Sequence, residues 1–113
     1  MTPWKNIEKV QDIDNLIKSS YEKPQLIFKH STRCSISAMA LQRFERNWDE
    51  NNRKIDLNFL DLIAIRPVSS HVADVLEVQH ESPQVLLIVN GKCIYHTSHN
   101  DISVTGITQN LAS

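Results

Sequence analysis

The sequence predicts an α/β fold in which helices cover both faces of one central mixed β-sheet. Strand-like and helix-like segments alternate along most of the 113 residues, which is typical of parallel strands joined by helices. The run from Gln25 to Lys29 is apolar enough for a strand covered on both faces. Asn90-Gly91 is a strong hairpin signal, so the last two strands are expected to be antiparallel. With 41% hydrophobic residues, residues 1–113 are expected to form a single domain.

The first half of the chain is expected to form two strand–helix pairs. Trp4 to Val10 has the pattern of a short edge strand, and Asp12 to Ser20 that of a helix. Pro24 opens the strand Gln25 to Lys29, and a second helix spans residues 35–49. The inward stripes at helical spacing are Ile13, Leu16 and Ile17 in the first helix, and Ser37, Ala40, Leu41, Phe44 and Trp48 in the second.

The second half is expected to add a strand, a helix, a hairpin and a final helix. Asp56 to Ile63 alternates and then becomes apolar, and Pro67 fits the first turn of the next helix. The hairpin strands are Gln84 to Val89 and Lys92 to Thr97, and the last helix begins near Asp101. The expected inward residues of the helix are Val68, Val72, Val75 and Leu76. On the second hairpin strand, one face is expected to hold Cys93, Tyr95 and Thr97.

Charge and hydropathy narrow the classes of partner. The 12 basic and 13 acidic residues are interleaved, so no nucleic-acid or membrane-surface patch is predicted. The longest apolar run, Val85 to Val89, is far shorter than the roughly 20 residues that cross a bilayer. We therefore expect a cytoplasmic protein whose partners are small molecules or other proteins.

The two cysteines, Cys34 and Cys93, do not form a zinc-ligand or disulfide pattern. The five histidines do not complete one either, because a strand would place His96 and His99 on opposite faces. No metal site is expected. Cys93 is expected to be buried in its strand, with a resolving or regulatory role as the alternative.

Cys34 is expected to lie at the start of a helix, directly after a buried strand. The free N–H groups of the first helical turn stabilise an anion there and lower a thiol pKa. Arg33 precedes it, and no Asp or Glu follows before Glu45, so a thiolate would supply the missing anion. Ser37 stands where a dithiol enzyme keeps its resolving cysteine, and its hydroxyl is able to donate to the thiolate. The pattern is C-x-x-S, which favours monothiol chemistry; simple packing of a free cysteine is the alternative.

Ser82-Pro83 directly precedes a strand, the place where a cis proline would hold backbone groups open for an extended partner. Together with the order of elements, three segments resemble the YtxJ-type monothiol bacilliredoxins, a group with the thioredoxin-like fold that acts with the small thiol bacillithiol. They are Phe28-Lys-His-Ser-Thr-Arg-Cys-Ser-Ile-Ser37, His80-Glu-Ser-Pro-Gln84, and Ser98-His99 with Ile102.

The resemblance implies a thioredoxin-like three-layer α/β/α fold with Cys34 as the nucleophile and Pro83 as the cis-proline beside it. Ser98 and His99 would approach the same edge of the sheet. It further implies that bacillithiol is removed from mixed disulfides on proteins, with bacillithiol as co-substrate and no bound cofactor.

Three residues depart from the resemblance: Arg33 and Ser35, where related sequences usually carry threonine and proline, and Asn100, where they often carry an aromatic residue. Ser35 in place of proline adds a backbone N–H near the sulfur. Arg33 is expected to favour an anionic small thiol, such as one that bears a carboxylate. His99 is expected to tune the thiolate or contact the ligand, unless it is an ordinary surface histidine, and His30 is expected to pack or to give hydrogen-bonding support.

Two classes of function follow from these residues. One is a thiol–disulfide oxidoreductase acting through Cys34, with glutaredoxin-like use of another small thiol as a variant. The other is a non-catalytic thioredoxin-like module that binds peptides along the Ser82-Pro83 edge or senses redox state. They differ in whether Cys34 has a lowered pKa and exchanges disulfides.

Overall fold

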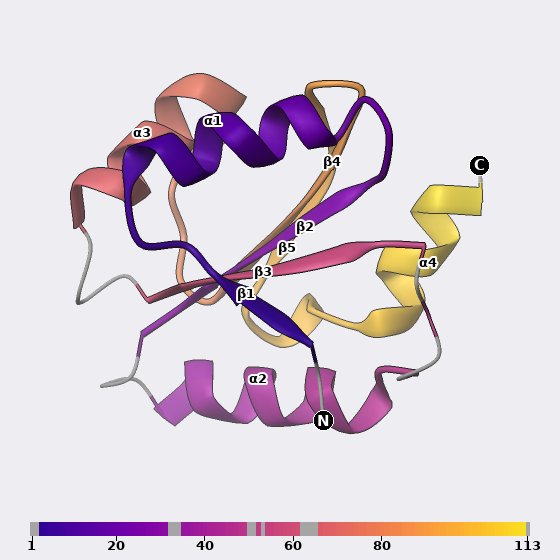
Figure 1. Cartoon of the computed structure of the whole chain (residues 1–113). Coiled ribbons are helices and arrows are strands. Elements are labelled where there is room, and N and C mark those ends of the chain that lie inside the picture. Colours follow the sequence, from indigo (N-terminus) through magenta and orange to yellow (C-terminus); the bar gives the residue numbers. More distant parts are fainter. Residues whose placement is uncertain (1–2, 32–34, 50–51, 53, 62–65, 113) are drawn as a thin grey trace.

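The computed structural model describes residues 3–31, 35–49, 52, 54–61 and 66–112. Figure 1 shows the strands as a twisted sheet between helices. In chain order the elements are β1 (Trp4–Asn6), α1 (Val10–Ser19), β2 (Gln25–His30), α2 (Ser35–Asn47), β3 (Asp56–Asp61), α3 (Arg66–Leu76), β4 (Gln84–Val89), β5 (Lys92–Ser98), η1 (His99–Asp101) and α4 (Val104–Ala112).

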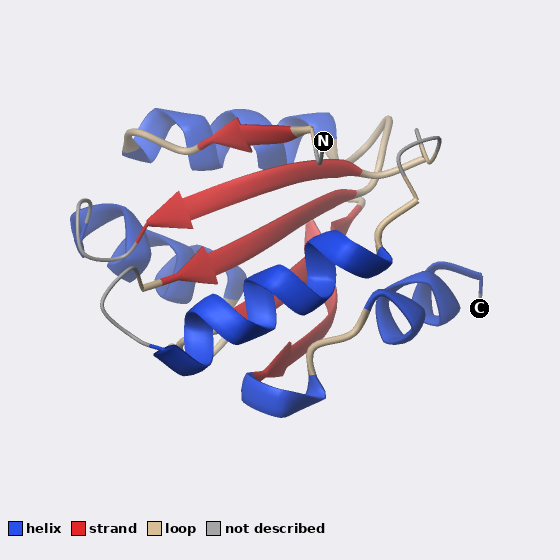
Figure 2. Ribbon diagram, turned by 90° about the horizontal axis from the view of Figure 1, so that it is seen from below, coloured by secondary structure: helices blue, strands red, loops and turns tan. Residues whose placement is uncertain are grey.

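The sheet is mixed and has the order β1-β3-β2-β4-β5. β1 and β2 run parallel to β3, whereas β4 runs antiparallel to both β2 and β5. Phe28 in the central strand β2 lies opposite Phe59 of β3 and Val85 of β4. Helices α1 and α3 cover one face, and α2 and α4 cover the other (Figures 1 and 2). The expected three-layer α/β/α architecture with a mixed sheet is confirmed.

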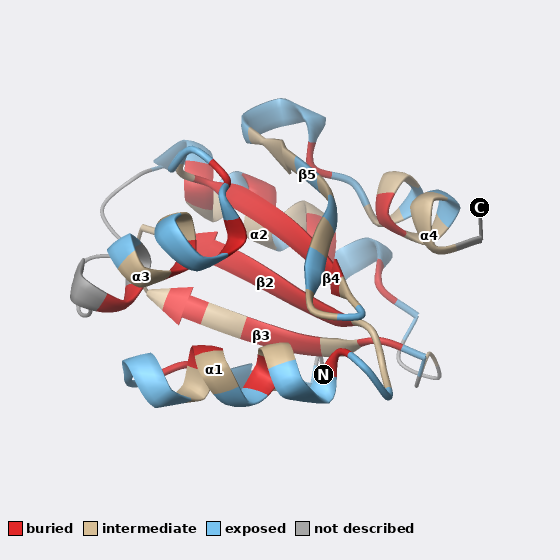
Figure 3. Cartoon of the chain, turned by 90° about the horizontal axis from the view of Figure 1, so that it is seen from above, coloured by how far each residue is buried: buried red, intermediate tan, exposed pale blue. Residues whose placement is uncertain are grey.

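The core has two halves because alternate strand residues point to opposite faces. Ile27, Leu86 and Ile88 pack with residues of α1 and α3. Leu26, Phe28 and Leu87 pack on the other face with residues of α2 and α4. Figure 3 shows β2 and β4 buried along nearly their whole length. Burying one such side chain stabilises the fold by about 1.5 to 3 kcal/mol, so both helical layers are held firmly on the sheet.

The prediction of a strand from Trp4 to Val10 is wrong beyond Asn6, and the first helix begins at Val10 rather than Asp12. The carboxylate of Asp12 accepts hydrogen bonds from the backbone N–H groups of Glu8 (2.9 Å) and Lys9 (3.1 Å). An acceptor in the first turn satisfies N–H groups that a helix leaves unpaired, so it sets the helix start before Asp12.

One expected inward residue and one helix start differ from the prediction. Val75 was expected to face the core but is 44% exposed, because Val68, Val72 and Leu76 form the buried stripe of α3 and Val75 lies beside it. The final helix begins at Val104 instead of near Asp101, since the 3₁₀ turn η1 comes first. The predicted strand end at Ile63 lies outside the described residues. On α2, Ser37, Ala40 and Phe44 are buried as expected, and so is Trp48 just beyond it, while Leu41 is half-buried.

The prediction that Cys93, Tyr95 and Thr97 share a face of β5 is wrong for Cys93. Cys93 lies opposite Ile88, and Tyr95 lies opposite Leu87, so Ile94 is an extra residue in the ladder. Such a β-bulge reverses the alternation of side chains. Cys93 therefore packs, half-buried, against the α1/α3 half of the core, whereas Tyr95 packs against the α2/α4 half.

The hairpin turn is fastened to the end of α1. Asn90 and Gly91 both have positive φ, 53° and 79°, as the Asn-Gly signal predicts. The N–H of Asn90 donates to the carbonyl of Ser20 (3.0 Å), and the N–H of Gly91 donates to the Ser20 hydroxyl (2.8 Å).

Among the described helices, none is long and apolar enough to cross a membrane.

Candidate redox site

The predicted nucleophile Cys34 and its neighbour Arg33 lie outside the described residues. The elements on either side are those expected, since β2 ends at His30 and α2 begins at Ser35. Ser35 is exposed in the first turn of α2, and that turn holds no acidic residue. The helix start therefore presents free N–H groups without a competing carboxylate.

Ser37 joins the end of β2 to the first turn of α2. Its side chain is fully buried, with Oγ 2.8 Å from Nδ1 of His30. The same Oγ accepts the backbone N–H of Ser31 at 3.1 Å. Burial lowers the pKa of His30, although the charge of Asp61, a hydrogen bond with Ser37 and the charge of Glu45 partly oppose this. A neutral, buried His30 is thus the hydrogen-bonded support of the strand–helix junction.

The loop before β4 carries the second part of the site. The Ser82–Pro83 peptide bond is cis, and Pro83 is buried. The register that pairs Lys29 with Gln84 brings the residues next along each strand, His30 and Pro83, to the same end of the β2–β4 pair. The buried Oγ of Ser82 has no hydrogen-bond partner among the described residues. The structure thus places the predicted proline loop beside the end of the strand that leads to Cys34.

Ser98 and His99 come to this same end, as the resemblance implied. Ser98 is half-buried and lies opposite Gln84 in the β4–β5 ladder. His99 is exposed, has a positive φ of 54°, and donates its backbone N–H to the carbonyl of Pro83 at 3.0 Å. The segment after β5 is therefore attached directly to the proline loop.

Arg43 holds that segment against α2, and the sequence did not single this residue out. Its guanidinium donates to the carbonyl oxygens of Ile102 (3.1 Å) and Asn100 (3.5 Å). The candidate site is consequently bordered by α2, by the loop before β4 and by η1. These carbonyls lie more than fifty residues after Arg43 in the sequence. No local sequence pattern therefore predicts the contact between Arg43 and this segment.

Lys29 and His80 form a second contact that the sequence did not predict. Lys29 is fully buried in β2, and its Nζ lies 3.2 Å from Nδ1 of His80 in the loop before β4. Burial lowers the pKa of Lys29 to about 8, while the negative charge of nearby Cys93, when ionised, acts in the opposite direction. Burial and then the Lys29 charge lower the pKa of His80, with Glu81 opposing. The available signal was a lysine inside a strand expected to be covered on both faces.

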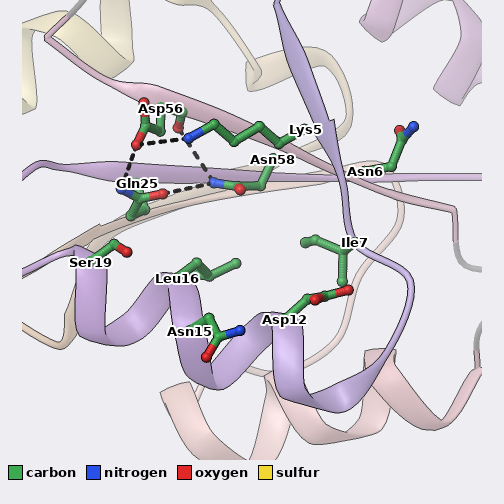
Figure 4. A pocket seen from close by; sticks show the side chains of 10 residues that line it. All are labelled: Lys5, Asn6, Ile7, Asp12, Asn15, Leu16, Ser19, Gln25, Asp56 and Asn58. Atoms are coloured by element: carbon green, nitrogen blue, oxygen red, sulfur yellow. Dashed lines mark hydrogen bonds and ion pairs between the residues drawn. The ribbon is translucent and has the colours of Figure 1, made fainter.

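A polar pocket of about 210 Å³ lies at the other end of β2 (Figure 4). Asp56 receives hydrogen bonds or ion pairs from Lys23, Gln25 and Lys5 there, and Asn58 donates to Gln25 Oε1 at 3.1 Å. The lining residues are Lys5, Asn6, Ile7, Asp12, Asn15, Leu16, Ser19, Gln25, Asp56 and Asn58. This pocket is separate from the site described above, because Gln25 and His30 are the two ends of β2. Within the described part of the chain, no group of His, Cys, Asp or Glu is arranged to hold a metal ion.

The model of one protein family, described as monothiol bacilliredoxin BrxC, matches residues 5–107. The chain belongs to the monothiol bacilliredoxin family. That membership agrees with the C-x-x-S sequence Cys34-Ser-Ile-Ser37, in which the last position holds a hydroxyl. Bacilliredoxins are thiol redox proteins.

Solved structures similar to this bacilliredoxin chain share its fold. One, described as a candidate oxidoreductase with a thioredoxin fold, has 29% sequence identity and a TM-score of 0.83, with 96% of this chain and 94% of that chain covered. The thioredoxin of Malassezia sympodialis has 16% identity and a TM-score of 0.71, with 98% and 86% covered. The thioredoxin of Trypanosoma brucei brucei has 14% identity and a TM-score of 0.73, with 99% and 91% covered. The last two likenesses establish the thioredoxin fold of this bacilliredoxin.

Proposed function

We propose that this chain is a monothiol thiol–disulfide oxidoreductase that removes bacillithiol from mixed disulfides on proteins. The Cys34 thiolate attacks the bacillithiol sulfur of the mixed disulfide. The old S–S bond breaks, the client protein leaves as a thiolate that takes up a proton, and a Cys34–bacillithiol disulfide forms. A second small thiol then attacks this disulfide and restores Cys34. Both steps are thiol–disulfide exchanges, so each conserves the number of disulfide bonds.

The observation that carries this proposal is the burial and bonding of Ser37. A dithiol enzyme resolves its mixed disulfide with a second cysteine three residues after the first. Here that position holds Ser37, which is fully buried and bonded to His30 and Ser31. The other cysteine, Cys93, packs on the α1/α3 side of the sheet, whereas α2 lies on the opposite side. Ser37 carries a hydroxyl in place of a thiol, and Cys93 packs on the face of the sheet away from α2. Neither residue is suited to resolve a mixed disulfide of Cys34, which supports release by an external thiol.

We assign the remaining site residues to supporting roles. The free N–H groups at the start of α2, including that of Ser35, and the charge of Arg33 favour the thiolate of Cys34. The Ser82-Pro83 segment offers its backbone edge to an extended client. Ser98 and His99 flank this edge, and His99 is exposed. The proposed setting is the reducing cytoplasm, where a small thiol that restores Cys34 stays reduced.

The proposal is tested by the rate of Cys34 alkylation against pH, with Cys34→Ser and Cys93→Ser as controls. Mass spectrometry after incubation with a bacillithiolated protein then follows the bacillithiol mass. We expect titration well below the value of about 8.5 for a free thiol, and transfer of the mass to Cys34. An unshifted Cys34 that accepts no adduct would contradict the proposal and leave the non-catalytic peptide-binding or redox-sensor module.

The choice of small thiol is tested separately with Arg33→Glu. Bacillithiol carries carboxylates, so reversing the charge of residue 33 is expected to slow exchange with bacillithiolated clients more than exchange with an uncharged disulfide. Equal loss with both would argue against a role for Arg33 in recognition. Faster exchange with glutathionylated than with bacillithiolated clients would indicate glutaredoxin-like activity instead.

A further inference from the structure

Lys29 is a charged side chain in a place that does not favour charge. It has no exposed surface, and its neighbours across the ladders are Leu60 of β3 and Gln84 of β4. Among the described lysines, arginines and acids, it alone is buried. Removing an ammonium group from water costs free energy unless partners replace the lost hydration. The stability of the fold therefore does not explain this lysine.

Lys29 makes one hydrogen bond with the described part of the chain, from Nζ to Nδ1 of His80 at 3.2 Å. An ammonium group has three N–H donors, so two of them lack a described protein acceptor. A lysine is a donor only, so His80 accepts through Nδ1 and carries its proton on Nε2. The one described hydrogen bond of the buried cation thus goes to the loop that carries Ser82-Pro83.

The same loop is held to the sheet at its other residues. The side chain of Gln84, directly opposite Lys29, donates to the carbonyl of Gln79 (3.1 Å) and accepts the N–H of Glu81 (3.4 Å). The carbonyl of Pro83 accepts the N–H of His99 (3.0 Å). The contact between Lys29 and His80 is the one attachment among these that includes a group able to titrate near neutral pH.

The charges around this contact define how it responds to acid. The charges of Lys29 and, within the same loop, of Glu81 act on His80. The charge of Cys93 in β5, when it is ionised, acts on Lys29. On the helices that cover this face, Asp14 of α1 is bonded to His71 of α3 at 2.9 Å. Near neutral pH the ammonium donates to a neutral imidazole. Protonating His80 removes the acceptor and places two cations 3.2 Å apart, which opposes the contact.

We propose that His80 is a positioning residue that, through its contact with the buried Lys29, holds the loop with Ser82-Pro83 in place for exchange at Cys34 and releases it in acid. This inference rests on the proposed function, because the loop is assigned there to client binding. It adds a residue and a pH response that thiol chemistry alone does not require.

The first test measures the contact itself, without reference to activity. The imidazole of His80 is titrated by NMR in the wild type and in Lys29→Met, and the amide signals of Glu81 and Ser82 are followed over the same pH range. We expect the His80 pKa to rise in Lys29→Met, and the two amides to shift with the His80 midpoint in the wild type. In His80→Gln, which keeps an acceptor oxygen, those amides should no longer follow that midpoint.

The second test measures exchange between Cys34 and a peptide mixed disulfide from pH 5 to pH 8. Each rate is divided by the alkylation rate of Cys34 at that pH, which removes the effect of thiol ionisation. We expect the normalised rate of the wild type to fall roughly tenfold in acid, within the loss of up to about a hundredfold that a displaced positioning group causes. His80→Gln should stay level. His96→Gln is the matched control, since His96 is an exposed histidine of β5, and it should behave as the wild type.

The two tests separate failure of the inference from failure of the proposed function. Identical normalised pH profiles for the wild type and His80→Gln would overturn the positioning role, as would a His80 titration that Lys29→Met leaves unchanged. If Lys29→Met does not fold, His80→Gln alone decides, because it leaves Lys29 in place. Absence of exchange by the wild type at every pH would overturn both the proposed function and the client-positioning role, while the NMR titration would still measure the contact.

Discussion

The Oγ atom of Ser37 lies 2.8 Å from Nδ1 of His30. Because both side chains are buried, this contact fixes the first turn of α2 against the last residue of β2. The hydroxyl in the C-x-x-S sequence is therefore part of the structure of the junction, as well as a replacement for a resolving thiol.

Replacing Ser37 with alanine is expected to destabilise the fold by about 1 to 3 kcal/mol, because Nδ1 of His30 and the N–H of Ser31 lose their buried partner. The measurement is urea unfolding at pH 7. Ser70→Ala, at an exposed position of α3, is the control and should change stability by less than about 0.5 kcal/mol. Equal stability of Ser37→Ala and the wild type would show that these bonds contribute nothing net.

Cys93 is expected to react slowly with iodoacetamide at neutral pH. Burial raises the pKa of its thiol, although hydrogen bonds and the Lys29 charge oppose the shift, so little thiolate is present at pH 7. The measurement is the alkylation rate of Cys34→Ser, in which Cys93 remains, from pH 7 to pH 10. Near pH 7, Cys93 of the same protein unfolded in urea should be alkylated faster than Cys93 of the folded protein. Equal rates folded and unfolded would contradict the effect of burial.

Replacing Lys29 with methionine is expected to stabilise the fold. Burial lowers the pKa of Lys29 from 10.5 to about 8, which corresponds to a cost of at most roughly 3 kcal/mol for the buried charge. The pKa of Lys29 is lower in the folded state than in the unfolded state. At a pH between these two pKa values, the unfolded chain therefore binds more protons than the folded chain. The cost is thus fully present below about pH 8 and disappears as the pH rises through 10.5. Urea unfolding of both proteins at pH 7 and pH 10 checks this, and a gain in stability that does not shrink at pH 10 would exclude the buried charge as its source.

Asp56→Asn is expected to reduce stability at neutral pH by about 1 to 2 kcal/mol, since both lysines that contact Asp56 are partly in water. Burial alone would raise the pKa of Asp56, but Lys23, Gln25 and Lys5 outweigh it and lower the pKa below 3.8. The stabilisation is therefore present above pH 3.8 and is lost as the pH falls through the folded-state value. Unfolding at pH 7 and pH 3 should show a difference between the proteins that narrows in acid. Asp74→Asn, exposed on α3, is the control.

Gly91→Ala is expected to destabilise the hairpin turn for two reasons. The residue has a φ of 79°, which costs a side chain about 1 kcal/mol, and the new Cβ would overlap the Tyr21 hydroxyl group unless that side chain moved. Thermal unfolding of Gly91→Ala in the wild type and in a Tyr21→Ala background separates the two causes. The loss should be smaller without Tyr21; an equal loss in both backgrounds would assign the whole effect to backbone conformation.

The order of elements was predictable because each rests on a local pattern: the apolar run of β2, the stripe of α2 and the Asn-Gly turn between β4 and β5. Features set by distant contacts were not. The bulge at Ile94 depends on the pairing of β5 with β4, and the early start of α1 depends on the rotamer of Asp12. No periodicity within one segment contains that information.

Much the same holds for the site. The sequence indicated four residues of the site, His30, Ser37, Pro83 and His99, because each lies in or beside a segment with a recognisable pattern. These four residues meet at one end of the sheet. The sequence did not indicate that His80 would accept a hydrogen bond from Lys29, since the loop returns to β2 across fifty-one positions of sequence. A charged residue in a buried strand was the one local sign that a distant partner existed.

The bulge at Ile94 also bears on how the sheet ends. β5 is an outer strand, and a long regular outer strand offers unpaired N–H and C=O groups on which another chain can add. The extra residue interrupts that regular row near the middle of β5 and increases the local twist. The same irregularity that turns Cys93 toward the α1/α3 core therefore makes this edge a poor template for intermolecular strand addition.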